Sequence, residues 1–486
     1  MNNNFLLLIP VLLPIVAGIL VSVLNMKARG ARQGFLTLTM GASTVLAVIV
    51  LLTCRGQSFT FVRLGAVSLT LFVDELSVVS GLLFSILWFL TTLYAFGYMS
   101  HEENEVRFFT FFAVSMGIAV GLALAANPIT YYFFFELLTF VTFPIIVHEG
   151  DEESVAAGRK YLLYSIPGAV LVLVSAAITT YFSAGDSTFA YGGTLAAKAV
   201  SEVGAFLQFA CLLGFLGFGV KSAVFPLHAW LPAAYVAPTP VTALLHAVAV
   251  VKAGVFGVLR LVYYTYGFEL IKGTYAQYIP FALVCITIVY GSVMALRTRH
   301  LKKRLAYSTV SHLSYVLLAA FMLSKQGLQS ALVYMVFHAI IKITLFFCCG
   351  SVMFMTGTTD VSSMAGYGRK MKATFICFII AALGLCGVPP TAGFFGKWYI
   401  GLAAFGSGNN VLGTIGIVIM MISMLLTCLY LLPFAARSFA LDPLSEDANC
   451  KDPPFSMKLP VALIAVLIIV FGVAPGLLTN FIQAIG

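Results

Sequence analysis

The chain has 486 residues, of which 61% are hydrophobic and 9% are charged, and its mean hydropathy is +1.02. Soluble domains carry about 25% charged residues, so this composition excludes a chain whose surface mainly faces water. The formal net charge of +9 would suggest a nucleic-acid partner for a soluble protein, but basic residues also collect in the cytoplasmic loops of membrane proteins. We therefore expect one polytopic helical bundle in lipid and no nucleic-acid partner.

About fourteen apolar segments follow one another along the chain, each near the 20 residues that cross a bilayer. The first apolar segment lacks a basic n-region and a small-residue cleavage site, so we interpret it as a retained span and not as a signal peptide. The longest polar stretch, residues 441–454, is predicted to be a loop. The predicted spans are 4–24, 34–53, 75–98, 108–126, 129–147, 160–183, 204–224, 240–264, 276–296, 303–323, 327–354, 374–400, 411–437 and 457–480.

The basic residues indicate an orientation for these spans. With the N-terminus outside, seventeen Lys and Arg residues fall in inner loops and span ends and six, Arg260 among them, fall in outer ones. This is a strong positive-inside bias, and a span miscounted in the middle would remove it. We predict a multi-pass protein of the inner (cytoplasmic) membrane of a prokaryote, with both termini on the outer side.

The nine cysteines show no CxxC or CxxCH spacing, and Cys348 and Cys349 are neighbours within one span. We interpret all nine as buried thiols and expect no iron–sulfur, zinc or haem-attachment site. The sequence therefore predicts no cofactor and no bound metal.

Four lysines lie inside predicted spans: Lys221, Lys252, Lys342 and Lys397. A cation at the centre of a helix costs about 2.5–3.5 kcal/mol on insertion scales, so such residues face the bundle interior and mark ion pathways by default. A single lysine near a span end, such as Lys221, can instead extend to the headgroups. That alternative does not explain four of them together.

Glu136 is the clearest acidic partner for these lysines, within NPITYYFFFELLTFVTFPII (127–146). It is the only residue of fixed charge on its span. It is either a structural counter-ion for a lysine or one half of an ion pair that opens and closes, and the two interpretations are compatible.

Prolines interrupt two of the lysine-bearing spans. Pro226 follows Lys221 in FGVKSAVFPLHAWLP (218–232), and Pro389 and Pro390 precede Lys397 in LGLCGVPPTAGFFGKWYI (383–400). Proline removes a backbone hydrogen bond, and in lipid the freed groups need partners inside protein or in a wet cavity. We therefore predict discontinuous helices beside both lysines, although proline is also generally common in membrane helices.

The strings FGVK (218–221) and FFGK (394–397) fall in the seventh and twelfth spans. A five-span offset places two halves in opposite orientations, as in an inverted repeat. We predict an all-α polytopic protein with two inverted five-helix repeats that contain discontinuous helices. The predicted parts are an N-terminal three-helix segment at 1–107, repeats at 108–264 and 276–437, and a C-terminal transmembrane helix at 457–486.

Histidines accompany the interior lysines. His338 precedes Lys342 by four residues, so the two share a helix face, and His246 precedes Lys252 by six. Burial disfavours a charged lysine and histidine titrates near neutral pH, so such residues can load and release protons. Each histidine can equally be a core residue bonded to a carbonyl. A metal site is disfavoured because no second histidine lies at ligand spacing.

The segment KSAVFPLHAWLPAAYVAPTPVTALLHAVAVVKAGVFGVLR (221–260) resembles the signature of the antiporter-like subunits of respiratory complex I and of Mrp-type cation/proton antiporters. LKKRLAYSTVSHLSY (301–315), FHAIIKITLFFCCG (337–350), GYGRKM (366–371) and GVPPTAGFFGKWYI (387–400) continue the resemblance in the same order. It covers nearly the whole chain and extends to membrane-bound hydrogenases of the same superfamily. The FFGKWYI string is more similar to the Mrp D subunit and to the complex I M/N-type paralogues than to the longest paralogue.

The resemblance implies roles for individual residues. Glu136 matches the acid that pairs with the lysine of the seventh span, here Lys221. Lys252 matches the central relay lysine, and Lys397 matches the terminal lysine of the twelfth span. The remaining matches are relay positions: His338 and Lys342 in the eleventh span, where Tyr334 replaces a second histidine, and the secondary positions His228, His246 and His312.

The sequence departs from the family pattern in one segment. Family members often carry acids after LP and before APTP, whereas LPAAYVAPTP has Ala233 and Val236 near those places. Both lie near the predicted inner surface, so proton loading or a subunit contact there is expected to differ.

The resemblance implies a proton-translocating subunit of a multisubunit redox-driven membrane complex related to complex I or an energy-converting hydrogenase. In that case its partners are other membrane subunits, including further antiporter-like ones, and lipid. The chain itself is expected to do no redox chemistry.

The alternative is a D-type subunit of a Na⁺/H⁺ (Mrp) antiporter, with Na⁺ as the exchanged ion. A haem-bearing membrane redox subunit is a different class, disfavoured because paired axial histidines are not evident. A purely structural membrane scaffold leaves the four interior lysines unexplained.

Overall fold

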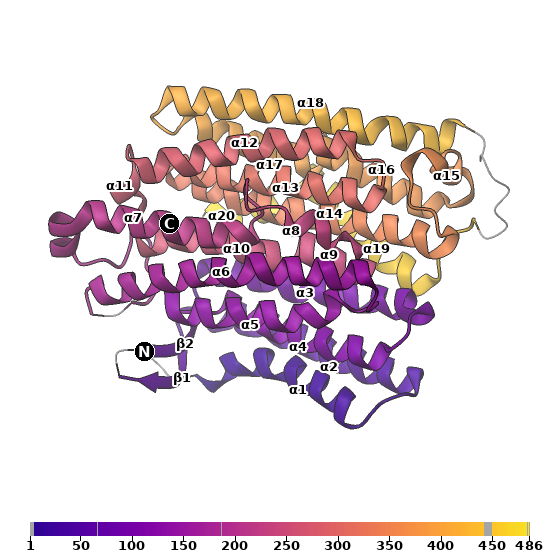
Figure 1. The fold of residues 1–486 in the computed structure, drawn as a ribbon, viewed down its shortest axis with the longest axis horizontal. Helices are drawn as coiled ribbons and strands as arrows, with labels where there is room; N and C mark the ends of the chain where they lie inside the picture. Colours follow the sequence, from indigo (N-terminus) through magenta and orange to yellow (C-terminus); the bar gives the residue numbers. More distant parts are fainter. Residues whose placement is uncertain (1–3, 66, 186, 442–449, 484, 486) are drawn as a thin grey trace.

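Long helices lie side by side along one common direction and form a single bundle (Figure 1). The computed structural model describes residues 4–65, 67–185, 187–441, 450–483 and 485. The first half of the chain forms η1 (Phe5–Leu8), α1 (Ile9–Val23), α2 (Arg29–Thr53), β1 (Ser58–Leu64), β2 (Val67–Phe72), α3 (Glu75–Tyr98), η2 (Met99–His101), α4 (Glu105–Ala123), α5 (Pro128–Ile146), α6 (Glu152–Phe182), α7 (Ala197–Lys221), α8 (Trp230–Ala233) and η3 (Ala234–Val236).

The second half continues the bundle and ends on a short helix. Its elements are α9 (Thr239–Ala247), α10 (Val250–Leu259), the π-helical turn η4 (Arg260–Thr265), α11 (Phe268–Ile271), α12 (Tyr275–Arg297), α13 (Leu301–Ala320), α14 (Lys325–Thr356), η5 (Val361–Met364), α15 (Tyr367–Lys370), α16 (Lys372–Cys386), α17 (Ala392–Phe405), α18 (Asn410–Ala440), α19 (Phe455–Val473) and α20 (Gly476–Gln483).

Each of the fourteen predicted spans coincides with helix. Among the described residues, twelve helical segments are long and apolar enough to cross a membrane. The other two predicted spans are α13, whose first turn contains Lys302, Lys303 and Arg304, and the segment divided between α16 and α17. The predicted all-α polytopic fold of about fourteen transmembrane helices is therefore confirmed.

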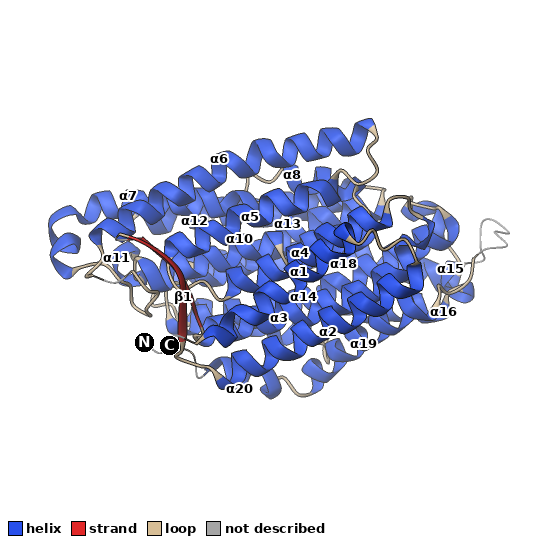
Figure 2. Cartoon of the chain, turned by 90° about the horizontal axis from the view of Figure 1, so that it is seen from below, coloured by secondary structure: helices blue, strands red, loops and turns tan. Residues whose placement is uncertain are grey.

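One element was not predicted. Strands β1 and β2 pair antiparallel, from Ser58 opposite Phe72 to Leu64 opposite Val67. The backbone of β2 also bonds to the connection between α4 and α5, through Phe72 N–H to the Leu124 carbonyl (2.7 Å). The hairpin lies at the end of the bundle that also holds η1 and α20 (Figures 1 and 2).

Among the described residues, the helices around the interior lysines are interrupted at the two predicted places and at a third; a separate kink lies inside α7 at Val203 (φ −127°, ψ 27°). After α7 ends at Lys221, residues 222–229 form turns that contain Pro226, and after α16 ends at Cys386, the turn to α17 contains Pro389 and Pro390. The unpredicted break separates α9 from α10, where Val248 leaves helical geometry (φ −125°, ψ −58°). All three breaks lie next to α10 or to α14, a continuous 32-residue helix whose apolar part is entirely buried in the bundle.

A candidate ion pathway

Lys221 is the last residue of α7, and its side chain is fully buried. Its ammonium group donates to the backbone carbonyl of Phe135 on α5 and lies 3.5 Å from the centre of the Phe135 ring. A cation at a helix C-terminus is favoured by the helix dipole, and the aromatic face adds a further attraction. The helix break at residue 222 thus lets a lysine end α7 inside the bundle.

Glu136 is the neighbour of Phe135 but is only half-buried. Its carboxylate is not within 4.0 Å of Lys221 or of any other described basic nitrogen, and its Oε2 is buried without a hydrogen-bond partner among the described residues. Phe133 and Phe140, which share its helix face, are 36% and 53% exposed. The predicted ion pair is therefore open in this structure, and Glu136 lies on a face that reaches the outside of the bundle.

Lys252 and His338 meet at the centre of the bundle. The Lys252 Nζ lies 2.9 Å from His338 Nδ1, which joins α10 to α14, and both side chains are fully buried. Lys252 comes in the first turn of α10, directly after the break at Val248. If the lysine is the donor, His338 Nδ1 is the acceptor and Nε2 carries the imidazole hydrogen; Nε2 has no partner among the described residues.

Lys342 and His246 both lie beyond this pair, toward the C-terminal end of α14. Lys342 is one helical turn beyond His338 on α14 and donates to the Leu305 carbonyl (3.0 Å) and to the Ser308 hydroxyl, both on α13. The His246 ring stacks on Phe346 with centroids 4.9 Å apart, and both ring nitrogens lack a partner among the described residues.

The interior basic residues form a row that includes Lys252, His338 and Lys342. His312 of α13 extends this row beyond His338, on the side away from Lys342. The two histidine rings are nearly parallel with centroids 6.1 Å apart. Its Nδ1 lies 2.7 Å from the Tyr334 hydroxyl and its Nε2 lies 3.2 Å from the Thr427 hydroxyl. Tyr334, which stands where the resemblance leads one to expect a histidine, thus contacts the row through its hydroxyl.

Lys397 lies near the start of α17 and is 3% exposed. Its ammonium group donates to the Leu385 carbonyl (2.5 Å), one residue before the end of α16, and lies 5.9 Å from the centre of the Tyr315 ring. This helix break places the lysine beside C-terminal carbonyls of α16, whereas Lys221 bonds to a carbonyl in the middle of α5.

The four lysines share one electrostatic property. Among the described residues, no carboxylate oxygen lies within 4.0 Å of any of their ammonium nitrogens. Their partners are carbonyls, one hydroxyl and one imidazole. A neutral acceptor does not hold a lysine in its charged form as a carboxylate would, so these side chains are suited to gaining and losing a proton.

Comparison with known proteins shows the family of the chain. Residues 125–423, more than half of the chain, match the family described as NADH:quinone oxidoreductase/Mrp antiporter, TM, and residues 61–109 match NADH-Ubiquinone oxidoreductase (complex I), chain 5 N-terminus. The chain belongs to the NADH:quinone oxidoreductase/Mrp antiporter family.

One curated relative and two solved structures show how far the likeness extends. Na(+)/H(+) antiporter subunit A1 of Staphylococcus haemolyticus (strain JCSC1435) is 30% identical over 98% of this chain and 62% of its own length. The Mrp complex from Dietzia sp. DQ12-45-1b has a chain with a TM-score of 0.86 and 25% identity, over 98% of this chain and 51% of that one. A chain of respiratory complex I from Thermus thermophilus matches with a TM-score of 0.81 and 23% identity, over 98% of both chains.

The chain thus spans about 62% of the length of the curated relatives that it matches. These relatives are A1 subunits, so the assignment to a D-type or M/N-type subunit stays a prediction. No group of three or more His, Cys, Asp or Glu side chains that could hold a metal occurs among the residues that the structure describes.

A buried ion pair in this family member was missed from the sequence. Arg260, which was counted among the outer span ends, is 2% exposed and makes two hydrogen bonds to Asp74, the N-cap residue of α3. Burial alone would raise the pKa of Asp74, but Arg260 holds it below its usual value. The available signal was the position of Arg260, four residues inside the predicted span 240–264.

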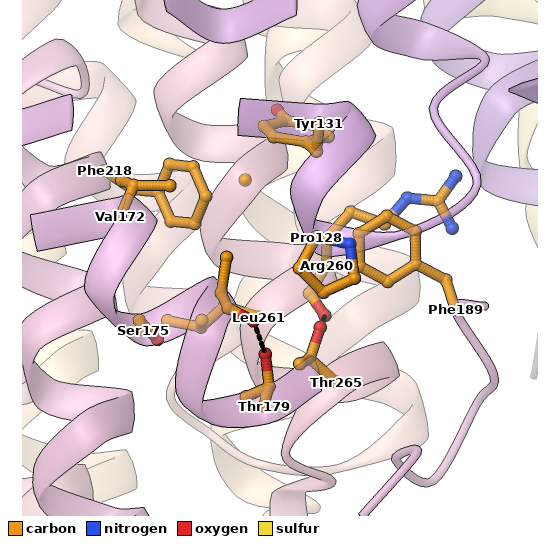
Figure 3. A pocket seen from close by; sticks show the side chains of 12 residues that line it. Pro128, Tyr131, Val172, Ser175, Thr179, Phe189, Phe218, Arg260, Leu261 and Thr265 are labelled. Atoms are coloured by element: carbon orange, nitrogen blue, oxygen red, sulfur yellow. Dashed lines mark hydrogen bonds between the residues drawn. The ribbon is translucent and has the colours of Figure 1, made fainter. Parts of the chain in front are cut away.

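Arg260 also borders a cavity of about 20 Å³, which has room for about one water molecule (Figure 3). Three aromatic rings, those of Phe189, Phe256 and Tyr264, lie 4.8–5.2 Å from its guanidinium carbon. The side chain is therefore held between a carboxylate and aromatic faces, and it forms the start of the π-helical turn η4.

The segment with Ala233 and Val236 also differs from what the sequence indicated. Lys302, in the first turn of α13, is 3% exposed and donates to the Ala237 carbonyl (2.7 Å). Glu153 of α6 accepts a hydrogen bond from the Tyr235 hydroxyl (2.9 Å). An acid from another helix therefore approaches the place where the family pattern has one in the segment itself.

His228 lies apart from the row of interior lysines. It lies within the break after α7, is 6% exposed, and its ring centroid lies 4.6 Å from that of Tyr290. In the described structure His228 makes no contact with another predicted relay residue, and its role stays a prediction.

Proposed function

We propose that this chain is the proton-translocating, antiporter-like subunit of a multisubunit, redox-driven membrane complex related to respiratory complex I or an energy-converting hydrogenase. The observation that carries the proposal is the set of buried basic residues along the helix breaks: Lys221, Lys252, His338, Lys342 and Lys397, with His246 and His312 beside them. Buried ionisable residues in a membrane protein are expensive and mark ion paths.

Glu136 and Lys221 act as the entry switch. When the carboxylate approaches Lys221, it stabilises the ammonium form; when a neighbouring subunit draws Glu136 away, that stabilisation is lost and Lys221 releases its proton. The half-buried position of Glu136 between exposed Phe133 and Phe140 supports this role. A side chain on the outer face of the bundle is one that a neighbouring subunit can reach.

The proton then passes along Lys252, His338 and Lys342 to Lys397, with His246 and His312 beside the path. The gaps between these groups are bridged by water. The nitrogens His338 Nε2, His246 Nδ1 and His246 Nε2 support this, because all three are buried without a protein partner in the described structure, and water is the usual partner of such groups.

A second candidate function is that of a subunit in a Na⁺/H⁺ antiporter of the Mrp type. The observation that favours it is the 30% identity to a protein named Na(+)/H(+) antiporter subunit A1. The same basic row would carry protons in either case, so the two candidates differ in the driving reaction and in whether Na⁺ is exchanged.

We further propose that the chain resides in the inner membrane of a prokaryote with both termini outside. Its partners are other membrane subunits, including antiporter-like ones. Support comes from the positive-inside bias of its loops and from the likeness to chains of the Dietzia and Thermus complexes.

The test uses the native complex reconstituted in vesicles, with proton movement followed by a pH-sensitive dye. Glu136→Ala and Lys221→Ala are each expected to reduce pumping to background while the complex still assembles, and Lys198→Ala, at an 83% exposed side chain, is the control. Pumping that survives either change excludes the switch. Proton movement driven by a Na⁺ gradient without an electron donor favours the antiporter candidate instead.

A further inference from the structure

A polar pocket of about 800 Å³ opens at the end of the bundle opposite η1 and α20, where α1 meets α2 and α3 meets α4. None of the four interior lysines lines it, and it plays no part in the proposed pathway. The charged side chains that line it are Lys27, Arg29, Arg32, Arg107, Glu102 and Glu105.

The basic side chains of this pocket exceed the acidic ones by four to two. Arg29 and Arg32 both bind the one carboxylate of Glu105. No described carboxylate lies within 4.0 Å of the Lys27 or Arg107 charged nitrogens. The pocket therefore holds positive charge that its own acids do not neutralise.

Arg32 also supplies a buried hydrogen-bond donor at this pocket. Its side chain is 2% exposed, and its Nε has no partner among the described residues. An unpaired buried N–H is costly, and an anionic oxygen in the pocket would satisfy it with a charge-assisted hydrogen bond.

Two helix N-termini converge on the same pocket. The N-cap residues Ala28 of α2 and Asn104 of α4 make no side-chain capping bond, and Arg29, Asn104 and Glu105 line the pocket. The free N–H groups of the first turns and the helix dipoles favour an anion at such a place. Both helices are long, with 25 and 19 residues.

Apolar side chains indicate that the anion is attached to a lipid. In the last turns of α1, Ile19, Val23 and Leu24 are 50%, 73% and 59% exposed, next to the pocket residues Ser22 and Asn25. An apolar wall that ends in a basic pocket matches an acyl chain that ends in a phosphate, and basic pockets between transmembrane helices bind anionic headgroups.

We propose that this pocket binds the phosphate headgroup of an anionic phospholipid, with its acyl chains along the exposed face of α1. The lipid fills the junction between the first two helices and α4. The uncapped N-termini and Arg32 contact the phosphate, and Lys27 and Arg107 supply the charge that selects an anionic lipid over a zwitterionic one.

The test compares two double variants of the purified native complex in mixed micelles of detergent and phosphatidylcholine that contain fluorescent phosphatidylglycerol. Lys27→Gln/Arg107→Gln removes two charges from the pocket. Lys370→Gln/Lys372→Gln removes two exposed charges near α15, outside the pocket, and is the matched control. We expect binding to weaken about thirtyfold in the first variant, because each basic group near an anionic headgroup contributes a factor of about five, and to stay unchanged in the second.

Every outcome of this titration decides the proposal. The proposal of a lipid site is supported if phosphatidylglycerol binding weakens only in the pocket variant and if millimolar inorganic phosphate does not displace the bound lipid. Equal weakening in both variants overturns it, because binding then reflects net charge alone. Full displacement by inorganic phosphate also overturns it and indicates a soluble anion. Pumping does not enter the measurement, so this result is separate from that of the entry switch.

Discussion

At the scale of single residues, the bundle holds buried cations in two different ways. Arg260 is paired with the carboxylate of Asp74 and enclosed by aromatic rings. The four interior lysines, in contrast, contact carbonyls, a hydroxyl and an imidazole. A carboxylate partner fixes a charge, whereas a neutral partner leaves it variable. We infer that Arg260 is structural and that the lysines are the residues that exchange protons.

Loss of Arg260 is therefore expected to lower stability strongly. Arg260→Met leaves the buried carboxylate of Asp74 without its counter-charge, and breaking a buried pair in this way costs about 3–5 kcal/mol. Adding Asp74→Asn removes the orphaned charge while an amide oxygen can still cap α3, so the double variant is expected to recover part of the loss.

Thermal unfolding of the two variants in detergent measures the difference. If the single and double variants unfold at the same temperature, the penalty is lost packing and not an unpaired carboxylate. If both match the unchanged protein, Arg260 has no structural role.

At the scale of the elements, the helix breaks determine where the interior lysines lie. At the break between α16 and α17, a glycine allows the two half-helices to approach closely. A Cβ atom at Gly393 of α17 would lie 1.8 Å from the Gly384 carbonyl oxygen of α16. The two half-helices therefore approach closely enough for Lys397 to reach the Leu385 carbonyl. Gly401 on the same helix has open space, because a Cβ atom there would have no neighbour within 4 Å.

Gly393→Ala is expected to force α16 and α17 apart. Overpacking of a tight contact costs about 1–3 kcal/mol, and proton pumping should fall because Lys397 loses its place beside α16. Gly401→Ala is the matched control, since alanine is the better helix former by about 1 kcal/mol and meets no neighbour there. Equal melting temperatures and equal pumping for both variants would show that the close approach is not required.

Hydropathy and proline positions predicted those features of the fold that depend on the residues of a single span. Hydropathy located the spans, and Pro226, Pro389 and Pro390 located two breaks. The break at Val248 has no proline at the break itself, so only the packing of α9 against α14 and of α10 against α7 shows it.

The candidate site was predictable only in its composition. Buried lysines and histidines stand out in apolar sequence, but their partners come from other helices, as Phe135 does for Lys221 and Leu305 for Lys342. The pairing of Arg260 with Asp74 joins residues 186 positions apart, which no local pattern indicates. The open Glu136–Lys221 pair likewise depends on side-chain positions that spacing does not determine.

At the scale of the whole molecule, both ends of the described chain lie on one side. The guanidinium of Arg55, just after α2, lies 5.2 Å from the centre of the Phe481 ring on α20, and Figure 1 shows the hairpin at this end and α15 at the other. An even number of crossings produces this arrangement. The basic residues of α15 and of the lipid pocket then share the opposite side, which the positive-inside rule assigns to the cytoplasm.

Cysteine labelling tests this orientation. Lys198→Cys at the start of α7 and Lys370→Cys in α15 place exposed thiols at opposite ends of the bundle. A membrane-impermeant maleimide added to intact cells is expected to modify only the Lys198→Cys variant, and the Lys370→Cys variant should react only after permeabilisation. The unchanged chain is the control, because seven of its nine thiols are buried and the other two, Cys377 and Cys428, are partly buried. The reverse labelling pattern would place the termini inside, and the entry switch would then open toward the other face of the membrane.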